Sequence, residues 1–338
     1  MLSGKFDSEL VTAILLRYSR NPRKPRRTVV PMEKIDYQGW PDSVRLSNGD
    51  AELVVLTAVG PRIIHYGLPG GPNVFNVFRE PVEPAADDEW IPIGGHRLWV
   101  APEQNPRSYH PDRGPVGSVV EENGELVVTN PVESTSGIAK ELRIRLAASG
   151  TGVTVTHKIT NHNLWGINVA PWALSIVANG GAVVLPQEPF VPHSQNLLPA
   201  RQLVLWKFTD MADPRWRWGT KYITLTQRDD LKHAQKLGVH SKLGWGAHVT
   251  PEQVFVVQID PDDPAAYTDY GSNFETFTAG AFQELETLGP LASLEPGESA
   301  LHVQKWYLEA LSEQNITGSD DLLDAHLLPI VERAKAAF

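Results

Sequence analysis

The chain of 338 residues contains no cysteine and no long uninterrupted apolar run. Without cysteine it forms neither a disulfide nor a thiolate metal site, which is typical of proteins from a reducing cytoplasm, the location we expect. The apolar stretch at residues 11–16 is too short to cross a bilayer and is ended by Arg17. No small-residue cleavage site follows it, so we predict neither a secretory signal nor a membrane partner.

Acidic residues outnumber basic ones outside the N-terminal region. The net charge is −10, yet residues 1–31 hold seven basic and two acidic residues, a net of +5, which leaves −15 on the remainder. A body this acidic repels a phosphate backbone, so we expect no nucleic-acid partner. We predict that residues 1–31 form a basic, poorly ordered extension outside the functional domain. The alternative is a tail that binds nucleic acid or membrane.

From about residue 44 onward, short runs with alternating apolar residues are separated by Gly, Pro, Asn and Asp. In Glu141–Leu146, for example, every second residue is apolar, which is the period of a half-buried strand. About twelve such segments with almost no helical periodicity between them predict an all-β protein, a large antiparallel β-sandwich, rather than βαβ units. The predicted strands are Glu52–Thr57, Arg62–Tyr66, Glu125–Thr129, Glu141–Leu146, Val153–Thr160, Ala182–Leu185, Gln202–Trp206, Tyr222–Gln227, Gln253–Ile259, Asn273–Thr278, Phe282–Leu288 and Leu301–Leu308.

One segment has clear helical periodicity. Asp320–Ala337 follows Ser319, a suitable N-cap, and carries its apolar residues on one side, with a kink expected at Pro329. We find no internal repeat and no long linker. The sequence therefore predicts one sandwich over residues 32–312 and a C-terminal helical segment over residues 313–338.

Four motifs occur in an order that resembles the galactose mutarotase-like (aldose 1-epimerase-like) superfamily. They are Gly60-Pro61-Arg62-Ile63-Ile64, Gly94-Gly95-His96-Arg97-Leu98-Trp99, Thr160-Asn161 leading into Asn168-Val169-Ala170-Pro171-Trp172, and Leu294-Glu295-Pro296-Gly297-Glu298-Ser299 before a strand that ends at Trp306-Tyr307. The resemblance covers roughly residues 37–310 and is nearer to a bacterial branch than to housekeeping aldose 1-epimerases. It implies a large antiparallel sandwich with a sugar groove across one sheet.

Mutarotation opens and recloses a hemiacetal, which requires a base for the anomeric hydroxyl and an acid for the ring oxygen. The resemblance implies that Glu275 is the base and that Arg97 binds sugar hydroxyls. The histidine that serves as acid in the family is expected near residue 172, where this chain has Trp172. His96 is the remaining candidate for the acid, and sugar binding is better supported than epimerisation.

Each candidate also has a structural interpretation. Glu275 lies in an apolar strand and could pair with an arginine of the core. Glu284 and Glu286 are two apart, so they share a strand face, and a hairpin would bring one of them near Glu275. Paired carboxylates raise a pKa or hold a cation, whereas the alternative is a solvated face. Arg97 could instead pair with Glu103 or Asp88.

Tryptophan is abundant, with ten residues. Trp216 and Trp218 would project from one side of an extended segment, with Asp210 as a polar neighbour, and indole rings stack on sugar rings. Trp99 and Trp172 fall within the matched motifs. The alternative for all four is a place in the core. We predict that His157 is a hydrogen-bonded core residue, and His233 and His240, in a lysine-rich loop, do not indicate a metal site.

These observations predict a small-molecule carbohydrate as the partner, with neither cofactor nor metal. The leading hypothesis is a carbohydrate-binding protein of the aldose 1-epimerase-like type that acts as a sugar mutarotase or epimerase. One alternative is a non-catalytic carbohydrate-binding or sensing module. A weaker one is a hydrolase or lyase that uses Glu275 and Glu286 as an acid/base pair. Nothing in the sequence identifies the sugar or the oligomeric state.

Overall fold

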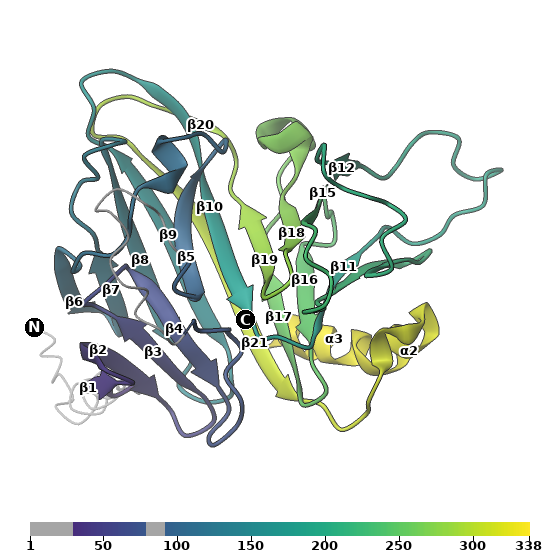
Figure 1. Ribbon diagram of the computed structural model, residues 1–338, viewed down its shortest axis with the longest axis horizontal. Helices are drawn as coiled ribbons and strands as arrows, with labels where there is room; N and C mark the ends of the chain where they lie inside the picture. The colour runs from purple at the N-terminus through teal and green to yellow at the C-terminus, as the bar shows by residue number, and fades with distance from the viewer. Residues whose placement is uncertain (1–29, 79–91) are drawn as a thin grey trace, which may run out of the picture.

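The computed structural model describes residues 30–78 and 92–338, and it consists of two large antiparallel sheets packed face to face (Figure 1). This confirms the all-β sandwich predicted from the alternating pattern. Most of the predicted N-terminal extension (residues 1–29) and Asp88 lie outside the described residues. Of that extension, Val30 is described, and its side chain is buried in the core.

The first sheet has eleven strands. In spatial order they are β1 (Met32–Tyr37), β2 (Trp40–Ser47), β3 (Glu52–Leu56), β4 (Arg62–Gly67), β5 (Gly95–Ala101), β10 (Ile167–Val177), β19 (Gln283–Leu288), β18 (Phe274–Thr278), β15 (Gln235–Val239) and β12 (Leu203–Leu205), and β20 (Ala292–Leu294) pairs with one end of β10. Its middle is thus assembled from strands that are far apart in the sequence.

The second sheet has ten strands. In spatial order they are β13 (Trp216–Trp218), β14 (Tyr222–Thr226), β11 (Ala182–Pro186), β16 (Trp245–Val249), β17 (Gln253–Gln258), β21 (Ser299–Ala310), β9 (Val153–Asn161), β8 (Ile138–Leu146), β7 (Glu125–Thr129) and β6 (Ser118–Glu122). In β8 and β9 buried and half-buried residues alternate over all nine positions, as the sequence pattern predicted.

The space between the sheets is filled by aliphatic side chains around an aromatic centre. Tyr66, Phe75 and Phe255 surround Trp306, with ring centroids 5.5–5.8 Å from that indole. Such close-packed aromatic burial is a major source of sandwich stability.

A polar chain also crosses this core. Ser175 Oγ lies 2.8 Å from His96 Nδ1, and His96 Nε2 lies 2.7 Å from His157 Nε2. His157 Nδ1 donates a hydrogen bond to the main-chain carbonyl of His302 over 3.0 Å. The ring of His302 continues the chain, because its Nε2 lies 2.6 Å from Thr287 Oγ1. His157 is therefore the hydrogen-bonded core histidine that the sequence predicted.

The predicted C-terminal helix is two short helices, α2 (Asp320–His326) and α3 (Leu328–Ala336). The Ser319 side chain accepts a hydrogen bond from the Leu322 N–H and caps α2, as expected. Pro329 lies in the first turn of α3, where proline is tolerated, so the chain begins a new helix there. α3 packs against β17 and β21, and Leu323 of α2 belongs to the same buried apolar cluster, which also contains residues of β16. In the part of the chain that is described, neither helix has the length and apolarity needed to cross a bilayer.

Candidate functional site

A pocket of about 310 Å³ lies on the outer face of the eleven-stranded sheet, over β5, β10, β19, β18 and β15. This volume is at the small end of the range for ligand sites. Seven aromatic side chains and four charged ones dominate its lining. The lining residues are Arg97, Trp99, Glu103, Tyr109, Trp172, Leu174, Trp206, Phe208, Lys236, Phe277, Phe282 and Glu284.

One wall of the pocket is built by β5 and β10. Their register pairs Trp99 with Trp172 and Arg97 with Leu174. The two indoles pack edge to face, with centroids 5.5 Å apart, and Tyr109 packs against Trp99 at 5.0 Å. Because side chains in a strand alternate between faces, the β5 and β10 residues of this wall project outward while their neighbours in the strands fill the core.

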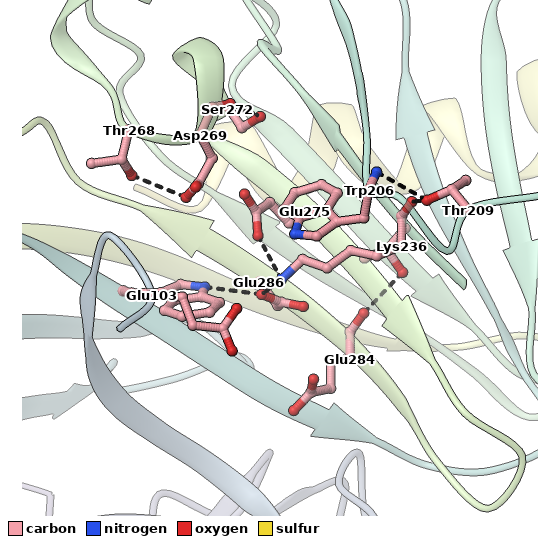
Figure 2. A network of polar contacts seen from close by, with 12 residues as sticks. Glu103, Trp206, Thr209, Lys236, Thr268, Asp269, Ser272, Glu275, Glu284 and Glu286 are labelled. Atoms are coloured by element: carbon pink, nitrogen blue, oxygen red, sulfur yellow. Dashed lines mark hydrogen bonds and ion pairs between the residues drawn. The ribbon is translucent and has the colours of Figure 1, made fainter. Parts of the chain in front are cut away.

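Beneath the pocket lies a cluster of two carboxylates and one ammonium group. Glu275 on β18 is directly opposite Glu286 on β19. Lys236 Nζ from β15 lies 2.8 Å from Glu275 Oε2 and 3.1 Å from Glu286 Oε2 (Figure 2). Trp172 Nε1 donates a hydrogen bond to Glu286 Oε2 over 2.9 Å. Both carboxylates are fully buried. Lys236 lines the pocket, so Glu275 and Glu286 lie behind it.

Burial and the neighbouring charges together set the protonation of this cluster. Burial raises the pKa of Glu275 to about 8; the Lys236 ammonium opposes this increase and Glu286 adds to it. Burial also raises the pKa of Glu286. Burial would lower the pKa of Lys236, but the two adjacent carboxylates outweigh it and the pKa is raised. One ammonium neutralises one carboxylate, so near pH 7 the carboxyl pair retains a proton.

The Lys236 ammonium is also held between two indole faces. Its Nζ lies 4.7 Å from the Trp172 ring centroid and 4.8 Å from that of Trp206. Figure 2 shows the Lys236 side chain running between Trp206 and the carboxylates. The loop that carries Trp206 is tied to β15, because Thr209 accepts a hydrogen bond from the Trp206 N–H and donates one to the Lys236 carbonyl. The aromatic and ionic contacts therefore fix the lysine in one position.

The second cation of the pocket is also paired. Arg97 Nη2 lies 2.9 Å from Glu284 Oε1, and the guanidinium lies over the Trp99 ring at 4.9 Å. Glu103, one of the two partners expected for Arg97, instead accepts a hydrogen bond from Tyr109 Oη. Arg97 and Glu284 thus form a fixed polar pair beside the aromatic wall.

Solved structures share this strand arrangement. A candidate aldose 1-epimerase from Klebsiella pneumoniae superposes with a TM-score of 0.54 at 10% sequence identity, over 82% of this chain and 83% of that one. A galactose mutarotase-like protein from Lactobacillus casei gives a TM-score of 0.51 at 10% identity, over 79% and 100%. The chain has the galactose mutarotase-like fold.

Part of a longer protein has the same fold. A TPR-domain containing protein from Parabacteroides distasonis gives a TM-score of 0.50 at 15% identity, over 79% of this chain and only 46% of that protein's length. No family model and no curated protein matches the sequence. The galactose mutarotase-like resemblance inferred from the four motifs is thus confirmed at the level of the fold.

In this chain, which has the galactose mutarotase-like fold, His96 is not part of the pocket. It precedes Arg97 in β5 and therefore faces the core, where its ring is fully buried and both nitrogens are engaged by Ser175 and His157. Burial, together with the nearby His157, holds the pKa of His96 well below its ordinary value, so the ring is neutral. The expectation that His96 acts as the acid beside Arg97 is therefore replaced by a core role.

The second tryptophan pair also lies elsewhere. Trp216 and Trp218 belong to β13 of the ten-stranded sheet and stack on each other with centroids 5.2 Å apart. Trp216 is buried and donates to Gln235, whereas Trp218 is 36% exposed. Asp210 accepts a hydrogen bond from the Ala212 N–H in a turn. The tryptophans share a face as expected, but neither they nor Asp210 line the pocket.

Sequence reasoning missed the pocket residues Lys236 on β15 and Trp206 and Phe208 on the loop after β12. Lys236 was placed in a lysine-rich loop, although Leu237 and Val239 alternate with Lys236 and Gly238 as in a strand. Trp206 was included in a predicted strand without a role. Of the predicted site residues, the structure does bring together Arg97, Trp99 and Trp172, with Glu275 and Glu286 behind Lys236.

Proposed function

We propose that this chain binds a carbohydrate in the pocket over β5, β10, β19, β18 and β15. The observation that carries the proposal is the combination of Trp99, Trp172 and Trp206 with the paired groups Arg97–Glu284 in one concave site. Indole faces cover the apolar faces of a pyranose ring, while fixed charged groups exchange hydrogen bonds with its hydroxyls. The fold shared with a candidate aldose 1-epimerase supports the same class of ligand.

Trp206→Ala is expected to weaken sugar binding about tenfold, on the order of 1.4 kcal/mol, because it removes one face of the aromatic enclosure. Isothermal titration calorimetry against a panel of hexoses, pentoses and their phosphates measures this. Trp165→Ala is the matched control, because Trp165 is 64% exposed and does not line the pocket. Equal affinities for Trp206→Ala and the wild type would place the sugar elsewhere.

A second candidate, aldose 1-epimerase activity, is favoured by the protonation of the carboxyl cluster. With the pKa of Glu275 raised to about 8, the pair of carboxyls holds one proton near pH 7 and so contains both an acid and a base. Ring opening transfers the anomeric hydroxyl proton to the base, breaks the C1–ring oxygen bond and places a proton on the ring oxygen. Lys236 lies between these carboxyls and the pocket and would pass protons to the sugar.

If the protein is an epimerase, Glu275→Gln should abolish the acceleration of α/β interconversion and leave sugar binding within about threefold. Polarimetry on freshly dissolved α-anomers measures the rate, and calorimetry on the same variant measures binding. A wild type that binds a sugar without accelerating its interconversion would make the protein a non-catalytic binding module.

The hydrolase or lyase interpretation receives no support from the cluster. A glycosidase places its two carboxyls on opposite sides of the scissile bond. Here Glu275 and Glu286 lie side by side on neighbouring strands and contact the same ammonium group.

A further inference from the structure

The pocket extends across the sheet beyond the tryptophan wall, over the five neighbouring strands β5, β10, β19, β18 and β15. Its lining runs from Trp99 on β5 to Phe277 on β18 and Lys236 on β15. Neighbouring strands lie about 4.8 Å apart, so these five strands span about 19 Å. The site is thus longer than a single pyranose ring, and its far end is chemically different from the end that holds the tryptophans.

Three phenylalanines form this far end. Phe277 on β18 packs against Phe282 with centroids 5.6 Å apart and against Phe208 at 6.4 Å. We call Phe208, Phe277 and Phe282 the phenylalanine platform. Phe78 packs edge to face on Phe282 at 6.0 Å and holds it in place. All three platform residues line the pocket, and Phe208 is 45% exposed.

The platform lies next to the polar groups of the site. Glu284 is the next pocket-facing residue after Phe282, and Lys236 pairs in register with Phe277. A ligand whose first ring lies over Lys236 and Glu284 therefore meets aromatic surface where a second ring would follow. A contiguous apolar patch beside paired charged groups is typical of a ligand-binding groove, which favours a ligand that covers both.

Resting on the proposed sugar binding, we infer that the ligand is a reducing disaccharide whose second ring stacks on the phenylalanine platform. A sugar ring has an apolar face for the platform and polar edges that stay in water at the open side near Phe208. The second ring is attached to a hydroxyl of the first ring other than its anomeric hydroxyl. The hemiacetal of the first ring therefore remains free for the carboxyl cluster.

Calorimetric titration with glucose and galactose, and with cellobiose, maltose and lactose, tests this. At least one disaccharide is expected to bind tenfold or more tightly than its component monosaccharides. Phe208→Ala should lower the ratio of disaccharide to monosaccharide affinity about tenfold. Phe190→Ala is the matched control, because Phe190 is 70% exposed and does not line the pocket, and it should leave the ratio unchanged.

Equal affinity for monosaccharides and disaccharides, or an unchanged ratio in Phe208→Ala, would overturn the second subsite while leaving sugar binding intact. Tighter binding of phenyl β-glucoside than of every disaccharide would overturn the choice of a second sugar ring. Failure of every sugar to bind would overturn the proposed function itself, and the subsite with it.

Discussion

Lys236→Met is expected to destabilise the protein by about 3–5 kcal/mol at pH 8, because it leaves two buried carboxyls without their shared cation. Urea unfolding followed by tryptophan fluorescence measures the change. The loss should be smaller at pH 5, because lower pH makes it easier to protonate Glu275 and Glu286 in the folded state. The pH dependence distinguishes an electrostatic cause from simple loss of packing.

Lys305→Met provides the control for this prediction. Lys305 Nζ lies 3.4 Å from Asp260, whose side chain is 88% exposed, so this pair is a surface ion pair and its loss should cost less than about 1 kcal/mol. If Lys236→Met costs no more than Lys305→Met at pH 8, the buried cluster does not depend on its ammonium.

Stability is also expected to fall steeply as the pH drops from 6.5 towards 4. Burial lowers the pKa of four core histidines: His157 to about 4, His248 and His302 to about 3, and His96 well below its usual value. The unfolded chain binds protons at these residues below about pH 6.5, whereas the folded chain does not, so protons favour unfolding.

The carboxyl cluster opposes this trend. The folded-state pKa of Glu275 is raised to about 8, so its contribution to stability is present at low pH and lost as the pH rises through 8. The four histidines take up protons on unfolding and the one or two carboxyls release them, which leaves a net uptake of two to three protons. The free energy of unfolding therefore falls by about 3 kcal/mol for each unit by which the pH is lowered.

Urea midpoints between pH 6.5 and 4.5 measure this slope. His302→Gln should reduce it by about one proton, and His193→Gln, which alters an exposed histidine, should not change it. A flat profile over this range would mean that the buried histidines titrate normally.

The strands could be predicted from the sequence where one face of the strand is buried and the other is partly exposed to solvent. In β8 and β9 one face packs in the core and the other is half exposed, so the apolar residues alternate. In β10 and β19 nearly every residue is buried on both faces of the sheet. The order of polar and apolar residues therefore does not indicate which face carries the pocket. The side-by-side carboxylates were still predicted, because the two-residue spacing and the hairpin depend only on strand geometry.

The candidate site could be predicted only in part. Motif matching selected His96 together with Arg97, although the period of two in a strand turns adjacent side chains to opposite faces. Lys236 was missed because β15 is short and contains Gly238, which weakens a strand pattern. The positions of Trp206 and Phe208 depend on a loop tied to β15 by Thr209, a contact that a local pattern does not indicate.

The central place of β10 between β5 and β19 has a consequence for how the chain reaches its native state. The Trp172–Glu286 hydrogen bond joins residues 114 apart in sequence, and the Arg97–Glu284 pair joins residues 187 apart. Chains dominated by such distant contacts fold on the millisecond-to-second timescale, because long loops must close before the contacts form. During synthesis β5 and β10 can pair with each other, but β10 lacks its other neighbour until β19 is made, so a nascent chain acquires its pocket only when its last quarter is made.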